Sequence, residues 1–338
     1  MSNSINDVKR SLAVDVLKGI AIISVVVLHG LGPGGSLASW SGFHISQAVP
    51  IFILVMGLNA KRSLDRVAGV TPRELYASGY VGKRVKRLIA PALIAALALL
   101  AVARVRGIAP YIGPAWLLSK FPVPFPGQFF VGVSAYLALI TPLLYAAYRR
   151  SPHITTIACI LLSLGFELFA GTQGFLWPDR YFIYQSNPLR FIGLFGLGFW
   201  LADGTNPLLP RNRFIWPFAA ASSAFLAAYL LGWRPWFVGP EYPCSILAGG
   251  YSLLLTAAAL TWLPASSPNR ALHALGYLGM ASYHIFLVQG IRYGQLSEAI
   301  PIDQGIWLAI GFALCLAVGG GWYALETHRA GLAVSRRV

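Results

Sequence analysis

Three ionisable side chains stand in one apolar segment near the start of the chain, LAVDVLKGIAIISVVVLHG at residues 12–30. They are Asp15, Lys18 and His29. An ionisable group that faces lipid at mid-depth costs about 2.5–3.5 kcal/mol. We therefore expect these side chains to face the protein interior or a wet cavity, where such residues generally serve a function.

The spacing of Lys18 and His29 places them on one face of a helix. At about 100° and about 1.5 Å per residue, the step from one to the other closes about three turns and spans about 16 Å. We expect both side chains to face one interior cavity. Asp15 precedes Lys18 by three residues, so the two can pair as helix neighbours.

Histidine is the side chain best suited to accept a proton near neutral pH. A lysine toward the other end of the same face could hold an anionic group, and the separation of about 16 Å is similar to the reach of the pantetheine arm of coenzyme A. The alternative is that His29 is a buried histidine that only makes a hydrogen bond near a helix end.

The composition indicates a membrane protein, because 57% of the 338 residues are hydrophobic and only 11% are charged. Several apolar runs approach the ~18–20 residues that cross a bilayer, and none shows the short alternating pattern of a barrel strand. We expect an all-α, polytopic integral membrane helical bundle that forms a single domain over residues 1–338. The sequence carries no signal for an oligomeric state.

About ten transmembrane helices are expected. The predicted spans are residues 12–31, 44–60, 88–106, 128–148, 153–170, 188–204, 213–232, 243–264, 273–290 and 304–325. The loop between the second and third spans is the most basic, which predicts that it is cytoplasmic and that the N- and C-termini are cytoplasmic as well. In this loop TPRE at residues 71–74 predicts a helix start with a capping box. On the opposite side, Arg104 and Arg106 are the main exceptions to this charge rule, and Lys120, Arg180 and Arg234 are isolated ones.

The formal net charge of +15 is explained by these cytoplasmic loops and their contact with anionic membrane lipid. We therefore expect no nucleic-acid partner. Cys159, Cys244 and Cys315 lie in apolar segments at no motif spacing, so neither a metal site nor a disulfide framework is expected.

Four stretches resemble acyltransferase family 3, the multi-span membrane O-acyltransferases of bacterial envelope sugars, and within it the fucose 4-O-acetylase-like subgroup. The first is DVLKGIAIISVVVLHG, which is similar to the family's opening signature of Asp, a basic residue and, after ten residues, His. The others are VPIFILVMGLNAKR at 49–62, KRVKRLIAP at 83–91 and LGYLGMASYHIFLVQG at 275–290. The chain has Lys18, Met56 and Gln289 where family members usually have Arg, Ser and His.

The resemblance implies a multi-pass enzyme of the bacterial inner membrane. It would transfer an acetyl or other short acyl group from cytoplasmic acetyl-CoA, or another acyl-CoA, to a hydroxyl of a glycan or lipid-linked sugar. His29 would be the general base or a transient acyl carrier, Lys18 would help to hold the donor, and Asp15 would orient or balance Lys18. No metal is implied.

Other polar residues are candidates for binding. Arg84 and Arg87 could clamp the phosphates of coenzyme A, although basic residues beside a span also serve as topology signals and lipid contacts. Substrate-binding candidates are His284, Gln289, Arg292 and Arg190. His284 could equally make a core contact, and the two arginines could instead extend to the membrane interface. Glu167 is expected to face protein.

Two other functions remain open from sequence. A transporter or flippase of a glycan or lipid-linked precursor would use Lys18 and His29 along its path, and it would favour broken helices in two matched halves. We find no such halves in the sequence. A scaffold subunit of a polysaccharide assembly complex would only pack the three polar residues. The order of the motifs favours the enzyme.

Overall fold

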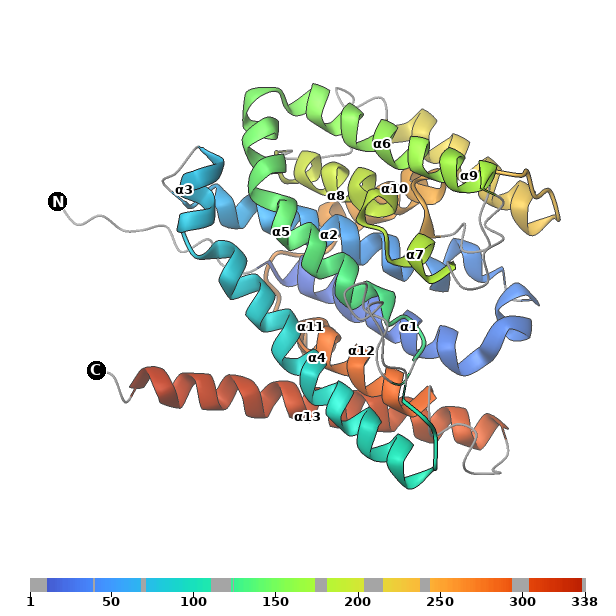
Figure 1. Cartoon of the computed structure of the whole chain (residues 1–338), viewed down its shortest axis with the longest axis vertical. Helices are drawn as coiled ribbons and strands as arrows, with labels where there is room; N and C mark the ends of the chain where they lie inside the picture. Colours follow the sequence, from blue (N-terminus) through green and yellow to red (C-terminus); the bar gives the residue numbers. More distant parts are fainter. Residues whose placement is uncertain are drawn as a thin grey trace.

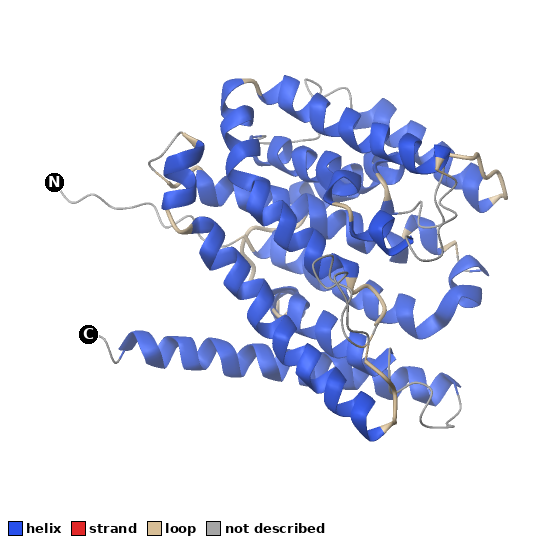
Figure 2. Cartoon of the chain, viewed as in Figure 1, coloured by secondary structure: helices blue, strands red, loops and turns tan. Residues whose placement is uncertain are grey.

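The computed structural model describes residues 11–38, 40–67, 71–110, 123, 125–173, 181–203, 215–237, 244–293 and 304–335 of the chain. These residues form helices joined by turns, with no strand among them (Figure 2). The expected all-α fold is therefore confirmed.

Each predicted span coincides with helix in the structure. The helices concerned are α1 (Leu12–Ala38), α2 (Ala48–Leu64), α4 (Tyr80–Val105), α5 (Phe129–Arg150), α6 (Pro152–Thr172), α8 (Pro188–Asp203), α9 (Ile215–Leu230), α10 (Gly249–Trp262), α11 (Arg270–Met280), α12 (Ser282–Ile291) and α13 (Gln304–Ser335). Shorter elements are α3 (Pro72–Ala77), α7 (Tyr181–Ser186) and the 3-10 turns η1 (Ser41–Phe43), η2 (Ile45–Gln47) and η6 (Ile246–Ala248).

Length and apolar composition qualify five helices of the described part to cross a membrane, namely those in α1, α4, α5, α6 and α13. The bent pair α11 and α12 makes a sixth if it is one span. The helices α2, α8, α9 and α10 have only 14–17 residues. A multi-pass membrane protein is thus supported, while ten crossings remain a prediction.

The span predicted at 273–290 consists of two helices in the structure instead of one. The axes of α11 and α12 differ by 63°. Ala281, between them, has ψ near zero, at −1°, which is a turn conformation and not that of a continuing helix. The bend directs α12 across α1 toward the end that carries His29.

Close helix crossings fix the centre of the bundle. A Cβ at Gly57 of α2 would lie 2.2 Å from the carbonyl oxygen of Phe195 in α8, and one at Gly279 of α11 would lie 1.8 Å from that of Asp15 in α1. Only glycine permits such an approach of two backbones, as is common between membrane helices. Gly57, which the family-like second motif retains, therefore has a packing role.

The predicted capping box is confirmed at the start of α3. The side chain of Thr71 accepts from the backbone N–H of Glu74 at 3.3 Å, and Glu74 accepts from that of Thr71 at 3.0 Å. In Figure 1, α3, the start of α4, the α5–α6 junction and the last turns of α13 all lie on the left. This agrees with a shared cytoplasmic side, which itself remains a prediction.

Candidate active site

A cavity of about 740 Å³ contains His29 in its wall. Its walls come from α1, from η1, η2 and the start of α2, from residues 125–130, from α12, and from residues 229–234. These segments are far apart in sequence, and the fold brings them together around the cavity. A cavity of this size suits a small-molecule substrate or part of one.

One face of α1 leads into the cavity. Ile22, Val25 and His29 follow Lys18 at helical spacing, and these three line the cavity together with Leu28. The prediction that Lys18 and His29 share a helix face is consistent with the unbroken helix. Lys18 itself is not among the lining residues of the described part, so the expectation that both side chains face this cavity is met by His29 alone.

The imidazole of His29 is held by Gln289 of α12. Its Nδ1 lies 2.7 Å from Oε1 of Gln289, whose Nε2 donates to the carbonyl oxygen of Pro126 at 3.3 Å. Because that carbonyl can only accept, the amide must present its oxygen to His29. Nδ1 then carries the proton, and Nε2 is the basic nitrogen.

The segment at residues 125–127 packs over this pair. The ring of Phe125 occupies the space of a Cβ at Gly290, which would lie 2.3 Å from its Cδ2. Gly127 has φ +79°, and a Cβ there would lie 3.0 Å from Cε2 of Phe286 and 3.6 Å from Cε1 of His29. This segment therefore fixes both the amide and the surface above the imidazole.

Aromatic rings make up much of the cavity wall. Phe130 packs with Phe286 at 5.7 Å between centroids and with Phe52 at 6.0 Å. Polar atoms come from a few side chains, including Gln185, Arg234 and Tyr283. Apolar walls with a few placed polar groups are typical of sites that bind and orient a small molecule.

Comparison with known proteins decides the family. The model of the acyltransferase domain of acyltransferase family 3 matches residues 11–326. The chain belongs to acyltransferase family 3. Neither the curated proteins nor the solved structures contain a match to the chain. The fucose 4-O-acetylase-like subgroup remains a prediction.

Membership makes this chain a membrane enzyme that transfers acyl groups. The resemblance carried by the opening motif is thereby confirmed at the level of the family, and all candidate residues lie inside the matched range. Among the described residues of this acyltransferase, no group of three or more His, Cys, Asp or Glu side chains could hold a metal ion.

Asp15 and Lys18 of the acyltransferase form the expected pair. Nζ of Lys18 lies 3.3 Å from Oδ1 of Asp15, with the lysine side chain 18% and the aspartate 9% exposed. The close crossing at Gly279 holds the backbone of Asp15 against α11. The lysine is thus held on the interior side of α1. It lies about one helical turn before Ile22, which is a residue of the cavity wall.

Arg84 and Arg87 lie in the first turns of α4 and outside the cavity wall. The guanidinium of Arg84 stands 5.6 Å from the ring centroid of Tyr80, and Arg87 is exposed. Tyr283 of the cavity wall donates to the carbonyl oxygen of Leu88 at 2.7 Å. This hydrogen bond ties the cavity to the helix turn that carries the arginines.

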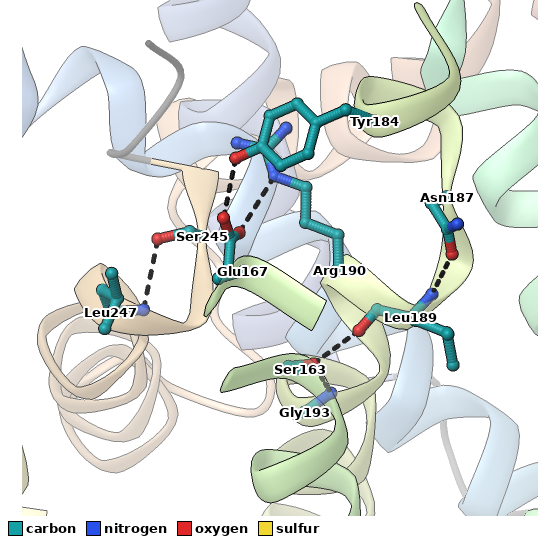
Figure 3. A network of polar contacts seen from close by, with 9 residues as sticks. All are labelled: Ser163, Glu167, Tyr184, Asn187, Leu189, Arg190, Gly193, Ser245 and Leu247. Carbon is teal, nitrogen blue, oxygen red and sulfur yellow. Dashed lines mark hydrogen bonds and ion pairs between the residues drawn. The ribbon is translucent and has the colours of Figure 1, made fainter. Parts of the chain in front are cut away.

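Arg190 is not at the cavity. It is fully buried in α8, where its Nε contacts Oε1 of Glu167 at 3.3 Å and its guanidinium lies 4.5 Å from the ring centroid of Tyr184 (Figure 3). Tyr184 donates to the other oxygen of Glu167 at 2.7 Å. This geometry favours a structural role for Arg190, whose predicted role in substrate binding stays a prediction, and it confirms that Glu167 faces protein.

Two further substrate-binding candidates also lie outside the cavity wall. Nε2 of His284 contacts Oε2 of Glu326 in α13 at 2.6 Å, and its ring packs against Trp322 at 5.0 Å. Arg292, which is 4% exposed, packs against Gly311 of α13, where a Cβ would lie 3.0 Å from its Nη2. Both residues join α12 to α13. Gln289, another of the four candidates, contacts His29.

Sequence reasoning missed Arg234 as a residue of the site. It was noted only as an isolated charge in an outer loop, yet it lines the cavity together with His29. The available signal was an arginine between two tryptophans in the stretch GWRPWF, since a charge among aromatic residues calls for a local partner or ligand.

Proposed function

We propose that this acyltransferase moves an acetyl or other short acyl group from cytoplasmic acyl-CoA to a hydroxyl of an envelope or exported glycan, in the bacterial inner membrane. His29 acts as general base or as transient acyl carrier. The observation that carries the proposal is the hydrogen bond of His29 Nδ1 to Gln289 at 2.7 Å. It supports Nε2 of a cavity-lining histidine as the proton acceptor.

In the direct reaction, Nε2 takes the proton of the sugar hydroxyl while the oxygen attacks the thioester carbonyl. The bond from the carbonyl carbon to sulfur breaks, and the leaving thiolate receives the proton from the imidazolium. In the stepwise form, Nε2 attacks the thioester carbonyl, the carbon–sulfur bond breaks and coenzyme A leaves as the thiolate. The sugar hydroxyl then attacks the acyl group, the carbon–nitrogen bond breaks, and the proton of the hydroxyl is taken up by the thiolate. Both forms return His29 to its initial state.

The donor would reach His29 from the side of Lys18. Support comes from the continuous helix face formed by Lys18, Ile22 and His29 and from the tie between Tyr283 and Leu88. Arg84 and Arg87 would bind the phosphates of coenzyme A, because guanidinium groups match phosphate oxygens in pairs. Binding of lipid phosphate by the same arginines is the competing role.

Radiolabelled acetyl transfer from acetyl-CoA in membranes that contain the full-length protein tests the proposal. We expect His29→Ala to lower the rate by about 10²-fold or more, the usual contribution of a positioned acid–base group. His153→Ala, at an exposed position at the start of α6, is the matched control and should transfer at the normal rate. A well-folded His29→Ala variant that transfers acetyl at the wild-type rate would refute the mechanism.

The acyl-carrier form has its own readout. With acceptor omitted and the reaction quenched in seconds, mass spectrometry of the peptide that contains His29 should show an added acetyl group if the stepwise form operates. An unmodified peptide together with rapid transfer on addition of acceptor supports direct attack.

Transport of a glycan precursor is the other candidate. The described residues contain one bent helix pair, α11 and α12, whereas broken helices in matched repeats are typical of transporters. Membership of an acyltransferase family favours the enzyme. Movement of a labelled precursor across vesicles without any acyl transfer would favour the transporter.

A further inference from the structure

Arg234 is an exposed cation in the wall of the cavity that contains His29. Its environment differs from that of the buried cations of the bundle. Lys61 contacts Asp203 at 2.6 Å, and Arg190 contacts Glu167 at 3.3 Å. In the described part of the chain, Arg234 has no carboxylate within ion-pair distance.

The backbone that carries Arg234 is held in place at the end of α9. The N–H of Trp233 donates to the carbonyl oxygen of Ala228 at 2.9 Å, and Gly232 has φ +99°. This arrangement is a glycine-terminated helix end, in which the left-handed residue lets the chain turn back on the last carbonyls. The helix end therefore fixes the direction in which the backbone leaves α9 at Arg234.

Aromatic packing secures the two sides of Arg234. Trp233 packs on Phe225 of α9 at 5.1 Å between centroids, and Phe237 packs on the same ring at 6.2 Å. The backbone of Phe237 lies against Gly171 of α6, where a Cβ would be 2.6 Å from its Cα. The residues on both sides of Arg234 are thus packed against α9, and Phe237 is packed against α6 as well.

The guanidinium itself is oriented by Tyr229, whose ring centroid lies 5.2 Å from its Cζ. Tyr229 is also a residue of the cavity wall. Stacking on a ring leaves the N–H groups at the guanidinium edge available for hydrogen bonds, and less side-chain freedom is lost when a ligand binds. Arg234 is thus prepared to bind an oxyanion.

The described side chains of the cavity wall include a cation but no carboxylate. The described residues that line it include Arg234 and His29 but no Asp or Glu. A cation in a largely apolar cavity wall, with no carboxylate among the described lining residues, favours an anionic ligand.

We propose that the acceptor carries an anionic group, which Arg234 binds while a hydroxyl of the same molecule reaches His29. This inference rests on the proposed function, since it names the class of acceptor for that reaction. The group is an oxyanion that can accept two N–H bonds from one guanidinium. It is either the carboxylate of an acidic sugar or the phosphate of a lipid-linked sugar.

Acceptor kinetics in membranes that contain the full-length enzyme test the inference. The probes are methyl glucuronoside, methyl glucoside and polyprenyl-diphosphate-linked glucose, each with acetyl-CoA. We expect the wild type to prefer one anionic probe over methyl glucoside by about tenfold or more in kcat/KM, as one charge-assisted contact would give. Preference for the glucuronoside identifies a carboxylate, and preference for the diphosphate identifies a phosphate.

Arg234→Gln should reduce that preference about tenfold through KM, and Arg234→Lys should keep part of it because the charge remains. Arg104→Gln removes an exposed arginine at the end of α4, outside the cavity wall, and should keep the wild-type preference. Equal kcat/KM for anionic and neutral probes in the wild type would overturn the inference, as would an unchanged preference in Arg234→Gln.

A binding readout separates this inference from the proposed reaction. Cys244 lines the cavity and is half-buried, whereas Cys159 and Cys315 are buried at 2% and 0% exposure. N-ethylmaleimide should therefore label Cys244, and the preferred anionic probe should slow that labelling in the wild type and in His29→Ala but not in Arg234→Gln.

The two assays fail in different ways. Protection of Cys244 by an anionic probe without any acyl transfer would refute the proposed reaction and keep the anion site. Acyl transfer with no discrimination between probes in either assay would keep the reaction and refute the anion site.

Discussion

His29 and Gln289 stand 260 positions apart in sequence, and their side chains meet at 2.7 Å between Nδ1 and Oε1. The amide is oriented in turn by its hydrogen bond to the carbonyl oxygen of Pro126 at 3.3 Å. The three groups form a directed chain from the backbone to the imidazole. Its effect is to place the lone pair of the histidine on Nε2.

Replacement of Gln289 should therefore change the reaction and not only the fold. Gln289→Leu removes the acceptor for Nδ1–H, so both tautomers of His29 become populated. We expect kcat to fall about fivefold, the kinetic equivalent of the roughly 1 kcal/mol that one hydrogen bond contributes. Steady-state acetyl transfer measures it, and an unchanged kcat would show that the hydrogen bond has no catalytic effect.

Gly127 gives a test of the segment that covers the imidazole. Gly127→Ala places a methyl group 3.0 Å from Phe286 and 3.6 Å from His29, at φ +79°. Gly107→Ala is the matched control, because Gly107 has φ +69° and nothing within 4 Å of the added Cβ. Both should lose about 1–2 kcal/mol of stability from the left-handed backbone.

Only Gly127→Ala should also lose activity, by about 10-fold to 100-fold, because a small displacement at the reacting centre is costly. Thermal unfolding in detergent and acetyl transfer in membranes give the two readouts. Equal activity of the two variants would mean that residues 125–127 do not position His29.

Local signals were sufficient to predict much of the fold. The capping box at Thr71 and Glu74 and the helical location of all ten apolar runs depend on residues within a few turns of one another. His29 was found for the same reason, because its distance from Lys18 is a property of one helix. The break at Ala281 was missed, since no proline marks it and its cause is the packing of α12 across α1.

Partners that come from distant helices could not be predicted. Arg190 resembles a substrate-binding cation in sequence, and only the fold shows Glu167 beside it. Arg234 is an isolated outer charge in sequence, and only the fold brings it to the cavity. A side chain's neighbours across a bundle depend on helix rotation and crossing, which a pattern of apolar residues does not specify.

The assignment of Arg190 to structure has a direct test. Arg190→Met leaves the carboxylate of Glu167, which is 1% exposed, without its cation, and should cost about 3–5 kcal/mol of stability. The double variant Glu167→Gln with Arg190→Met removes both charges and should recover part of that loss. Thermal unfolding in detergent measures both.

A substrate-binding role of Arg190 would give the opposite pattern. Arg190→Met would then unfold at the wild-type temperature and show a raised KM for the acceptor. The double variant would show no recovery of stability, since none would have been lost.

A second polar network joins α2, α5 and α8. It lies at the C-terminal end of α2, whereas the cavity that contains His29 lies at the start of α2. Nζ of Lys61 lies 2.6 Å from Oδ1 of Asp203 and 2.9 Å from Oδ2 of Asp65. Tyr145 donates to Asp65 at 2.8 Å and Tyr148 to Asp203 at 2.5 Å. One lysine thus pairs with two carboxylates at the place where α2, α5 and α8 meet.

Lys61→Met should leave these two carboxylates close together without a cation. The lysine side chain is 8% exposed but the aspartates are 36% and 45% exposed, so water screens part of the repulsion and we expect a loss of about 1–3 kcal/mol. Lys83→Met, at an exposed position in α4, should change stability by less than about 0.5 kcal/mol. Adding Asp203→Asn to Lys61→Met should restore part of the loss, because one of the two like charges is gone. If the double variant unfolds at a lower temperature than Lys61→Met alone, the network is held by the hydrogen bonds of Asp203 and not by charge balance.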